Sequence, residues 1–421
     1  MRSARESARL AAAVVYERLE TGHVFNPTSD ASQQDPYLLY RELREADPIH
    51  RSRAARGWIL LRHADCAAVL RDPRFSADDR NKSTAAQELR ARIQDGLTDP
   101  DAERNQVMLR SDPPDHTRLR GIVNKAFTPR AIAAWEPRIE EITHRLLDEL
   151  VQRPSFELLR DFAVPLPVTI IAEMLGVPSE DHTTFKRWSD HLVGFLDPAA
   201  SPGPEVLKQT VEEFGEFMGK IADERRREPR DDLLTALVQA EEAGNRLSEN
   251  DLLSTLALLL AAGNETTSNL IGNSVLALLR NPEQAARLRA EPDAMDAAVE
   301  ELLRWDSPVQ FTMRIPTEDL DFEGHRFEKG QQIILVLGSA NRDPAVYERP
   351  EELDLGRKEN RHLAFGFGIH FCLGAQLARA EGRIALRALF QRIPGLRLAT
   401  QQVRWRKLSF LRGLEALEVS G

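Results

Sequence analysis

The sequence contains little cysteine and no long hydrophobic run, and these absences exclude several classes of protein. With only two cysteines in 421 residues, the chain can form neither a disulfide framework nor a four-thiolate iron–sulfur cluster of its own. The apolar stretches at residues 10–16 and 252–262 are far shorter than the roughly 20 residues that a membrane-spanning helix needs. We therefore expect a soluble, cytoplasmic protein that does not enter a membrane.

A strong positive charge is also missing. The 56 basic residues are outnumbered by 66 acidic ones, giving a net charge of −10, which argues against nucleic acid as the main partner. What the chain does have is apolar material, at 42% of its residues. This composition is typical of a globular protein with a sizeable core rather than of a disordered or fibrous chain.

Prolines and hydrophobic periodicity divide the chain into a large helical part and a smaller strand-like part. Residues 1–25 are rich in Arg and Ala, and we expect a peripheral arm there, followed by a single domain over residues 26–421. We predict a mainly α fold with a smaller β portion (α+β). The helix-rich lobe should cover residues 112–306 and 375–392, and the β-rich portion residues 48–62, 307–337 and 393–421.

The most specific pattern surrounds Cys372, in the sequence FGFGIHFCLG at residues 365–374. Its glycines let the backbone fold tightly around one sulfur, and the neighbouring aromatic rings can shield that sulfur. The helix expected after Cys372 directs its positive end towards a thiolate, which suits a metal ligand. A structural cysteine in a tight turn is the alternative. Cys66, inside the helical pattern HADCAAVL, is interpreted as a small hydrophobic core residue. At Cys372, however, every fixed position of F-x-x-G-x-x-x-C-x-G is matched.

This segment resembles the haem-binding signature of the cytochrome P450 superfamily, whose further motifs occur in the expected order over roughly residues 30–420. The sequence ANRDP at 340–344, together with His370, is most similar to the soluble bacterial type. The resemblance implies the P450 fold, with a long central helix over the haem, and haem b (iron protoporphyrin IX) as cofactor. The residues that it implies around the iron are Cys372 as the ligand, with Phe365, Gly366 and Gly374 in the cofactor-binding loop.

A second motif stands in the middle of a Leu- and Ala-rich helical pattern at residues 248–280. The pattern begins with a capping arrangement at residues 248–251. At 262–267 the sequence AGNETT interrupts it. A Thr hydroxyl within a helix can bond to a carbonyl one turn earlier and distort the helix locally.

By resemblance, this distortion forms the oxygen-binding groove, and Ala262 is a cofactor-binding residue. Glu265 and Thr266 are then the acid–alcohol pair that relays protons during oxygen activation. The alternative is a close helix-packing site at Gly263, with the hydroxyl groups satisfied within the helix. An unpaired Glu265 among so many leucines would be costly without a partner or a water channel, which favours the functional interpretation.

Glu301 and Arg304 lie three residues apart, on one face of a predicted helix. Such pairs are common on protein surfaces, but the position of this one before Cys372 fits the E-x-x-R motif of the family. The resemblance implies a buried ion pair with Arg357 as its third member. Its role would be to hold the haem-binding core rather than to take part in catalysis.

Basic groups from separate segments match the family's positions for binding haem propionates. His116 and Arg120 lie four residues apart and so share one helix face, and Arg314 and His370 join them. Each alone is consistent with a solvated charge. Together they favour the anchoring of a dianionic haem, through bonds worth roughly 1.5–3 kcal/mol each.

The resemblance also implies where the substrate pocket lies. Its predicted lining comprises the polar loop at 76–109, the region around Phe195, and the residues Leu258, Val309, Phe311, Phe410 and Leu411. Outside the loop these residues are apolar, which predicts a hydrophobic substrate such as a terpenoid, steroid, fatty acid or macrocycle.

The chain shows no flavin or nicotinamide motif, so its electrons must come from separate proteins. By resemblance, these are a ferredoxin and its NAD(P)H-dependent reductase. Arg379, Arg383 and Arg387, spaced by four on one predicted helix, form either a solvated stripe or a docking patch for an acidic electron donor.

The sequence therefore predicts a monomeric haem-thiolate monooxygenase that inserts one oxygen atom from dioxygen into a hydrophobic substrate, by hydroxylation or epoxidation. Two other functions stay open. One is a hydrogen-peroxide-driven peroxygenase, which would not need Glu265 and Thr266. The other is a non-catalytic haem carrier or gas sensor.

Overall fold

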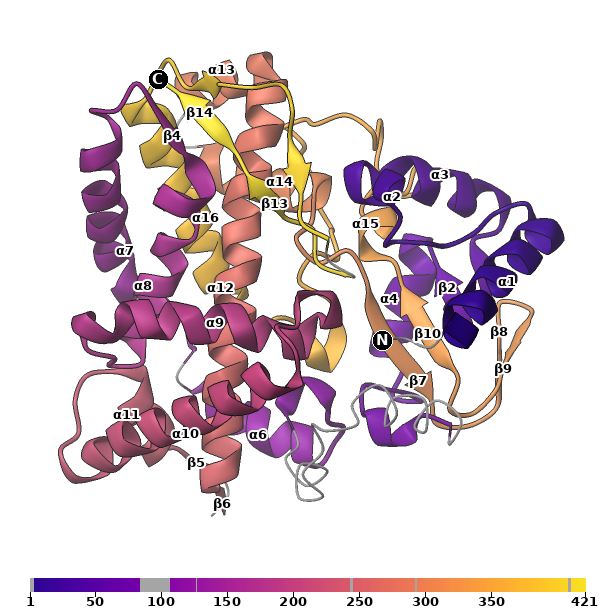
Figure 1. Ribbon diagram of the computed structural model, residues 1–421, viewed down its shortest axis with the longest axis horizontal. Coiled ribbons are helices and arrows are strands. Elements are labelled where there is room, and N and C mark those ends of the chain that lie inside the picture. Colours follow the sequence, from indigo (N-terminus) through magenta and orange to yellow (C-terminus); the bar gives the residue numbers. More distant parts are fainter. Residues whose placement is uncertain (1–3, 84–106, 126, 243–244, 292–293, 408–409) are drawn as a thin grey trace.

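The computed structural model describes residues 4–83, 107–125, 127–242, 245–291, 294–407 and 410–421 (Figure 1). Its helices are α1 (Ala4–Thr21), α2 (Asp30–Gln34), α3 (Pro36–Ala46), α4 (His63–Arg71), α6 (Asp115–Asn124), α7 (Pro129–Leu150), α8 (Pro165–Met174), α9 (His182–Leu196), α10 (Pro204–Arg227), α11 (Leu233–Gln239), α12 (Glu249–Arg280), α13 (Pro282–Ala290), α14 (Met295–Trp305), α15 (Leu337–Ala340) and α16 (Ala375–Arg392).

The strands are β1 (Ile49–Ser52), β2 (Gly57–Leu60), β3 (Phe75–Ser76), β4 (Ser155–Glu157), β5 (Glu241–Glu242), β6 (Asn245–Arg246), β7 (Thr312–Pro316), β8 (Leu320–Phe322), β9 (His325–Phe327), β10 (Gln332–Leu335), β11 (Arg397–Leu398), β12 (Arg404–Trp405), β13 (Leu414–Ala416) and β14 (Glu418–Ser420). Short turns of 3-10 or π helix are η1 (Asp79–Asn81), η2 (Met108–Arg110), η3 (Leu159–Ala163), η4 (Ser179–Asp181), η5 (Pro198–Ala200) and η7 (Gly368–His370).

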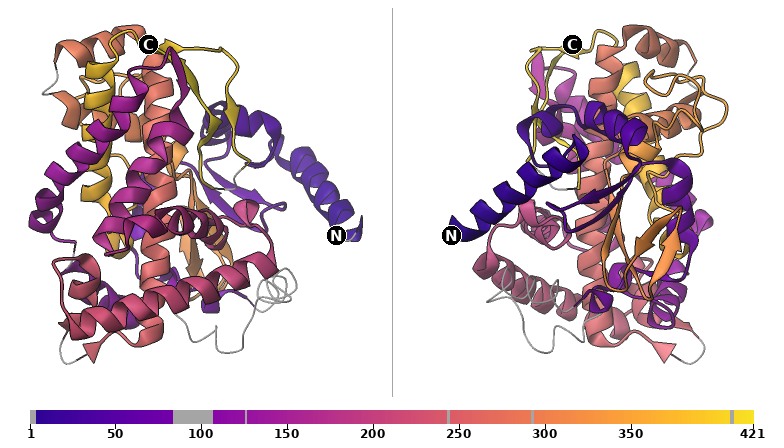
Figure 2. Two further views of the ribbon diagram at one scale, coloured as in Figure 1. Left: turned by 60° about the vertical axis from the view of Figure 1, so that its left-hand side comes forward. Right: turned by 90° about the vertical axis from the view of Figure 1, so that its right-hand side faces the viewer.

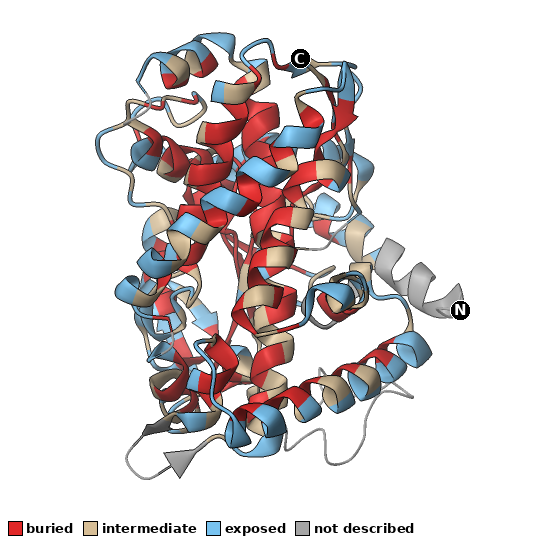
Figure 3. Ribbon diagram, turned by 90° about the vertical axis from the view of Figure 1, so that its left-hand side faces the viewer, coloured by how far each residue is buried: buried red, intermediate tan, exposed pale blue. Residues whose placement is uncertain are grey.

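The helix-rich part of the fold is built around α12, which runs through the molecule with α8, α9, α14 and α16 packed against it (Figure 1). Ser248 and Asp251 form a reciprocal capping box at its start, as the sequence predicts. Most of α12 is buried, and so is the middle of the helical body in Figure 3, because these four helices cover it. Polar side chains such as Asn264 and Asn269 are buried there together with its leucines and alanines. Even so, none of the described helices combines the length and the apolar character needed to cross a bilayer.

The smaller strand-rich part draws on both ends of the chain, which confirms the predicted mainly α fold with a minor β portion. Its main sheet has the strand order β1-β2-β10-β7-β3. β10 runs parallel to β2, with Gln332 opposite Gly57. β7 begins at Thr312, and before it Val309 forms an isolated bridge with Leu411.

The first helix, α1, projects from the body in Figure 2, but its last turns are firmly attached. The carboxylate of Glu17 is fully buried. It accepts hydrogen bonds from the ring of His50 at 3.0 Å, the hydroxyl of Ser52 at 2.9 Å and the N–H groups of Phe25 and Ala54. Burial would raise the pKa of Glu17, but these hydrogen bonds hold it below its usual range. His50, Ser52 and Ala54 belong to the strand hairpin, so this carboxylate attaches the predicted N-terminal arm to the domain.

Replacing Glu17 by glutamine is expected to lower the free energy of unfolding by about 1–3 kcal/mol, because buried His50 loses one of its two charged partners. Burial lowers the pKa of His50, but its bonds to Glu17 and Asp47 raise it above the ordinary 6.5. The loss of stability should be largest between pH 4.5 and pH 6.5, the ordinary pKa values of Glu17 and His50. It should become smaller as the pH falls through the lowered pKa of Glu17, or as it rises through the raised pKa of His50. Thermal unfolding at several pH values measures this loss of stability. Glu20→Gln, which removes an exposed ion pair with Arg53, is the control, and an unchanged Glu17→Gln protein would contradict this attachment.

Candidate active site

Cys372 lies in a tight loop between η7 and α16. Its N–H group donates to the carbonyl of Phe365 at 2.9 Å. Gly366 and Gly368 have φ angles of 70° and 73°, a left-handed backbone that glycine adopts without strain. A Cβ on Gly368 would also lie 2.4 Å from the carbonyl oxygen of Leu70. These glycines therefore permit the tight loop around the sulfur that the sequence predicts.

The Cys372 side chain remains accessible, although protein atoms surround it closely. Burial raises the pKa of its thiol, while the N–H group of Gly374 and the positive charges of Arg120 and Arg379 act to lower it. The latter three groups stabilise the anionic sulfur, and a coordinated metal ion deprotonates such a thiol outright. Cys66, by contrast, is fully buried, as predicted for a small hydrophobic core residue.

The predicted propionate-binding residues form one cluster. The rings of His116 and His370 have their centroids 4.2 Å apart. Both ring nitrogens of His116 and Nε2 of His370 are buried without a hydrogen-bond partner, which is costly unless a further group engages them. Burial and the nearby charges of Arg120 and Arg314 lower the pKa of both histidines, that of His370 to about 3. Unpartnered buried ring nitrogens beside two guanidinium groups fit the two carboxylates of a haem.

The middle of α12 keeps accessible surface within an otherwise buried helix. The Thr266 hydroxyl donates to the carbonyl of Ala262 at 2.6 Å, as predicted. α12 nevertheless stays α-helical over its whole length, so the expected local distortion does not interrupt it. A Cβ on Gly263 would meet nothing within 4 Å, which excludes close helix packing as the reason for this glycine.

Glu265 is buried next to Thr266, and the structure supplies the partner that its carboxylate needs. Glu265 forms an ion pair with Nη1 of Arg406, just after β12, and accepts a hydrogen bond from the amide of Asn269 at 3.1 Å. Burial lowers the pKa of Arg406, but the negative charge of Glu265 raises it overall. The acid of the predicted pair is therefore held by a side chain from the C-terminal strands.

Glu301 and Arg304 form a buried ion pair, with 2.7 Å between Nε and Oε2 and 2.8 Å between Nη2 and Oε1. Arg357 adds a second cation, with its Nε 3.0 Å from Oε2 of Glu301. Further N–H groups of Arg304 donate to the carbonyls of Asn341 and Pro350. The trio thus ties α14 to the long loop that leads to Cys372.

Most of the residues predicted to line the substrate pocket come together as an apolar group. Val309 bridges Leu411, and the ring centroids of Phe311 and Phe410 lie 6.1 Å apart. Leu258 is half-buried on α12. Most of the predicted loop at 76–109 and the side chain of Phe195 lie outside the described residues.

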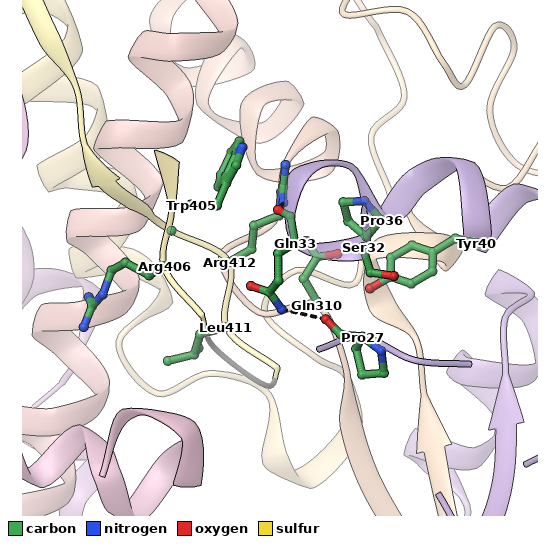
Figure 4. Close-up of a pocket in the computed structure, with 11 residues that line it drawn as sticks. Pro27, Ser32, Gln33, Pro36, Tyr40, Gln310, Trp405, Arg406, Leu411 and Arg412 are labelled. Carbon is green, nitrogen blue, oxygen red and sulfur yellow. Dashed lines mark hydrogen bonds between the residues drawn. The ribbon is translucent and has the colours of Figure 1, made fainter. Parts of the chain in front are cut away.

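A pocket opens between the N-terminal segment that includes α2 and α3 and the C-terminal strands (Figure 4). Its lining residues are Pro27, Ser32, Gln33, Pro36, Tyr40, Gln310, Trp405, Arg406, Leu411, Arg412 and Gly413. Of the predicted substrate-pocket residues, Leu411 alone contributes to it. Arg406 belongs to its wall, so the pocket adjoins the ion pair with Glu265.

The predicted basic stripe on α16 is not free. Arg379 forms an ion pair with Glu300 at 2.6 Å, and Arg383 forms one with Glu136 at 2.7 Å. Nε of Arg387 is buried without a partner. Arg379 and Arg383 are thus paired within the chain, and the docking patch for an electron donor stays a prediction.

Sequence reasoning missed both Arg406 and Glu300. Their partners stand far away in the chain, 141 residues from Arg406 and 79 residues from Glu300. The one available signal was indirect, because a buried carboxylate such as Glu265 requires a cation somewhere.

A model of the cytochrome P450 family matches residues 82–393. The chain is 41% identical over 406 residues to the polyketide biosynthesis cytochrome P450 PksS of Bacillus subtilis (strain 168), covering 94% of this chain and 98% of that protein. It is also 41% identical over 394 residues to the cytochrome P450 monooxygenase PikC of Streptomyces venezuelae, covering 91% of each.

Solved structures agree with these similarities in sequence. That of PksS aligns with a TM-score of 0.85 at 41% identity, covering 94% of this chain and 99% of the other. That of P450BioI in complex with hexadec-9Z-enoic acid ligated acyl carrier protein aligns with a TM-score of 0.82 at 37% identity, covering 93% and 100%. The motifs, the fold and these similarities lead to one conclusion: the chain belongs to the cytochrome P450 family.

Proposed function

We propose that Cys372, Thr266 and Glu265 carry the chemistry of this haem-thiolate monooxygenase. The enzyme inserts one oxygen atom from dioxygen into an organic substrate, with electrons from redox partners. The haem, when bound, supplies the iron at which oxygen is activated. The observation that carries the assignment is the accessible cysteine in a loop with left-handed glycines, next to buried His116 and half-buried His370, whose buried ring nitrogens have no partner.

In this proposal Cys372 ligates the iron, and the surrounding charges favour its anionic form. Phe365, Gly366 and Gly374 shape the loop around the sulfur, and Ala262 faces the cofactor from α12. The residues that hold the propionates are His116, Arg120, Arg314 and His370. Glu301, Arg304 and Arg357 keep the supporting loop in place.

Thr266 and Glu265 handle protons on the α12 side of the site. The Thr266 hydroxyl has its hydrogen directed to Ala262, which leaves its oxygen free to accept a further hydrogen bond. Glu265 is 7% exposed, whereas its partner Arg406 is 37% exposed and lines the pocket of Figure 4. One side chain therefore separates the buried carboxylate from solvent, which supports a proton supply from that direction.

The substrate is proposed to contact Leu258, Val309, Phe311, Phe410 and Leu411 and to be hydrophobic. The names of two relatives indicate which substrates to test first. PksS is a polyketide biosynthesis enzyme, and P450BioI was solved with an acyl carrier protein bearing a fatty acid. We propose macrocyclic polyketides and carrier-bound fatty acids as the first classes to screen. The redox partners are proposed to be a ferredoxin and its NAD(P)H-dependent reductase, and the monomeric state and cytoplasmic location stay predictions.

Thr266→Ala is expected to keep the haem and the spectrum of its carbon monoxide complex. It should lower product formed per NAD(P)H consumed by about tenfold or more, with the lost electrons recovered as hydrogen peroxide, because the proton-relaying hydroxyl is gone. Product, NAD(P)H and peroxide are measured together in a ferredoxin-supported reaction with a substrate found by screening.

Thr255→Ala is the matched control, since Thr255 makes the same bond to a carbonyl one turn earlier, 2.7 Å from that of Asp251 on the same helix. It should leave the product yield per electron unchanged. Equal yields from Thr266→Ala and wild type would contradict the relay. Turnover supported by added peroxide but not by the ferredoxin system would favour a peroxygenase, and no turnover in either system would favour a carrier or sensor.

A further inference from the structure

An ion network of Glu300, Arg379 and His362 packs against Phe365, in the loop that carries Cys372. Arg379 binds Glu300 through two bonds, Nε to Oε1 at 2.6 Å and Nη2 to Oε2 at 2.9 Å. Nε2 of His362 lies 3.2 Å from the same Oε2, and Nδ1 of His362 accepts the N–H of Ala364 at 3.2 Å. Because Nδ1 is an acceptor, Nε2 is the ring nitrogen that donates to Glu300.

This network is attached to the loop through an aromatic ring. The guanidinium of Arg379 lies 4.6 Å from the ring centroid of Phe365, within the range of a cation–π contact. The ring of His362 packs against Phe365 as well, at 5.9 Å. The carbonyl of Phe365 accepts the N–H of Cys372, so whatever fixes Phe365 also fixes the main chain at the sulfur.

Two positive charges lie against the loop that carries the sulfur. Arg379 stacks on Phe365, and Arg120 donates from its Nη2 to the carbonyl of Phe371, the residue before Cys372. Burial would raise the pKa of Glu300, but the bonds from His362 and Arg379 hold it at about 2. Glu300 thus stays negative and offsets part of the positive charge that Arg379 brings.

We propose that Glu300 and Arg379, braced by His362, are positioning residues that hold Phe365 against the Cys372 loop and set the charge near the thiolate, and thereby the reduction potential of the haem. The inference rests on the proposed role of Cys372 as iron ligand. Charges and hydrogen bonds around a ligand tune the potential of the metal that it holds. The side chains of Arg379 and Glu300 are 29% and 27% exposed, so solvent weakens the effect without removing it.

The test measures the midpoint potential of the full-length, haem-loaded protein. Arg379→Gln removes a positive charge and should make the potential more negative, since the added electron becomes less stable. Glu300→Gln removes a negative charge and should make it more positive. The double variant should have a midpoint potential near that of the wild type. Arg379→Lys keeps the charge but loses the flat stacking surface, so its potential should be closer to the wild-type value than that of Arg379→Gln.

Arg383→Gln is the matched control, because it changes the same charge one turn further along α16. Arg383 pairs with Glu136 and Asp296 and makes no contact with Phe365. The midpoint potential of Arg383→Gln should shift clearly less than that of Arg379→Gln. If the role were purely structural, the midpoint potentials of Arg379→Gln and Glu300→Gln would shift in the same direction. That result would overturn the inference, and so would equal shifts for Arg379→Gln and Arg383→Gln.

The spectrum of the reduced carbon monoxide complex separates this inference from the proposed function. A wild-type protein without the red-shifted Soret band of a thiolate ligand would overturn the role of Cys372 and the inference with it. A wild-type protein with that band, together with variants whose potentials do not move, would overturn the inference alone.

Discussion

Cys372→Ser is expected to abolish the red-shifted Soret band of the reduced carbon monoxide complex, and with it all dioxygen-dependent product formation. A thiolate donates electron density to the iron and favours cleavage of the O–O bond, whereas a serine hydroxyl in the same loop stays protonated and binds weakly. The loop itself should survive, since its shape depends on the glycines and on the Cys372 N–H group rather than on the sulfur. Absorption spectra and product analysis of the purified variant measure both losses.

Cys66→Ala serves as the control for this experiment. Its thiol is fully buried in α4 and donates to the carbonyl of Leu60, so the variant should keep the band and the activity. A Cys372→Ser protein that retained the thiolate band would show that another residue ligates the iron.

Arg304→Ala should strongly destabilise the folded protein. It leaves the Glu301 carboxylate, 1% exposed, with Arg357 as its remaining cation, and removes the donors that hold the carbonyls of Asn341 and Pro350. Breaking a buried pair in this way costs about 3–5 kcal/mol, a large part of the stability of an ordinary protein. We expect poor soluble expression and little bound haem, measured by thermal unfolding and by the ratio of haem to protein.

Arg226→Ala is its matched control, because Arg226 also pairs with an acidic residue three positions away, Asp223, but on the exposed face of α10. That variant should unfold as the wild type does. Normal haem content and stability in Arg304→Ala would mean that the buried pair does not hold the haem-binding core.

The features that could be predicted from the sequence are those that local spacing determines. α12 was visible from its capping residues and its Leu- and Ala-rich pattern, and the Glu301–Arg304 pair from its spacing of three. The loop at Cys372 was visible because tight turns require glycine at particular positions, here Gly366 and Gly368.

The features that could not be predicted join segments far apart in the chain. Arg406 stands in a short polar stretch that carries no mark of its partner Glu265, and Glu17 stands on a helix whose composition indicates a loose arm. The spacing of Arg379 and Arg383 indicated a surface stripe, because spacing identifies a shared helix face but not what packs against it. Only the assembled fold brings Glu300 and Glu136 to these arginines.

The parallel pairing of β2 with β10 has a consequence for biosynthesis. On the ribosome, β2 emerges early, but its neighbour Gln332–Leu335 is translated only after most of the chain. At a typical elongation rate this interval is on the order of half a minute. During that time one edge of β2, with Trp58, Ile59 and Leu60, has unpaired backbone groups and exposed apolar side chains, which promote aggregation. The yield of native enzyme should therefore depend more on chaperones that shield this nascent hairpin than on the stability of the finished protein.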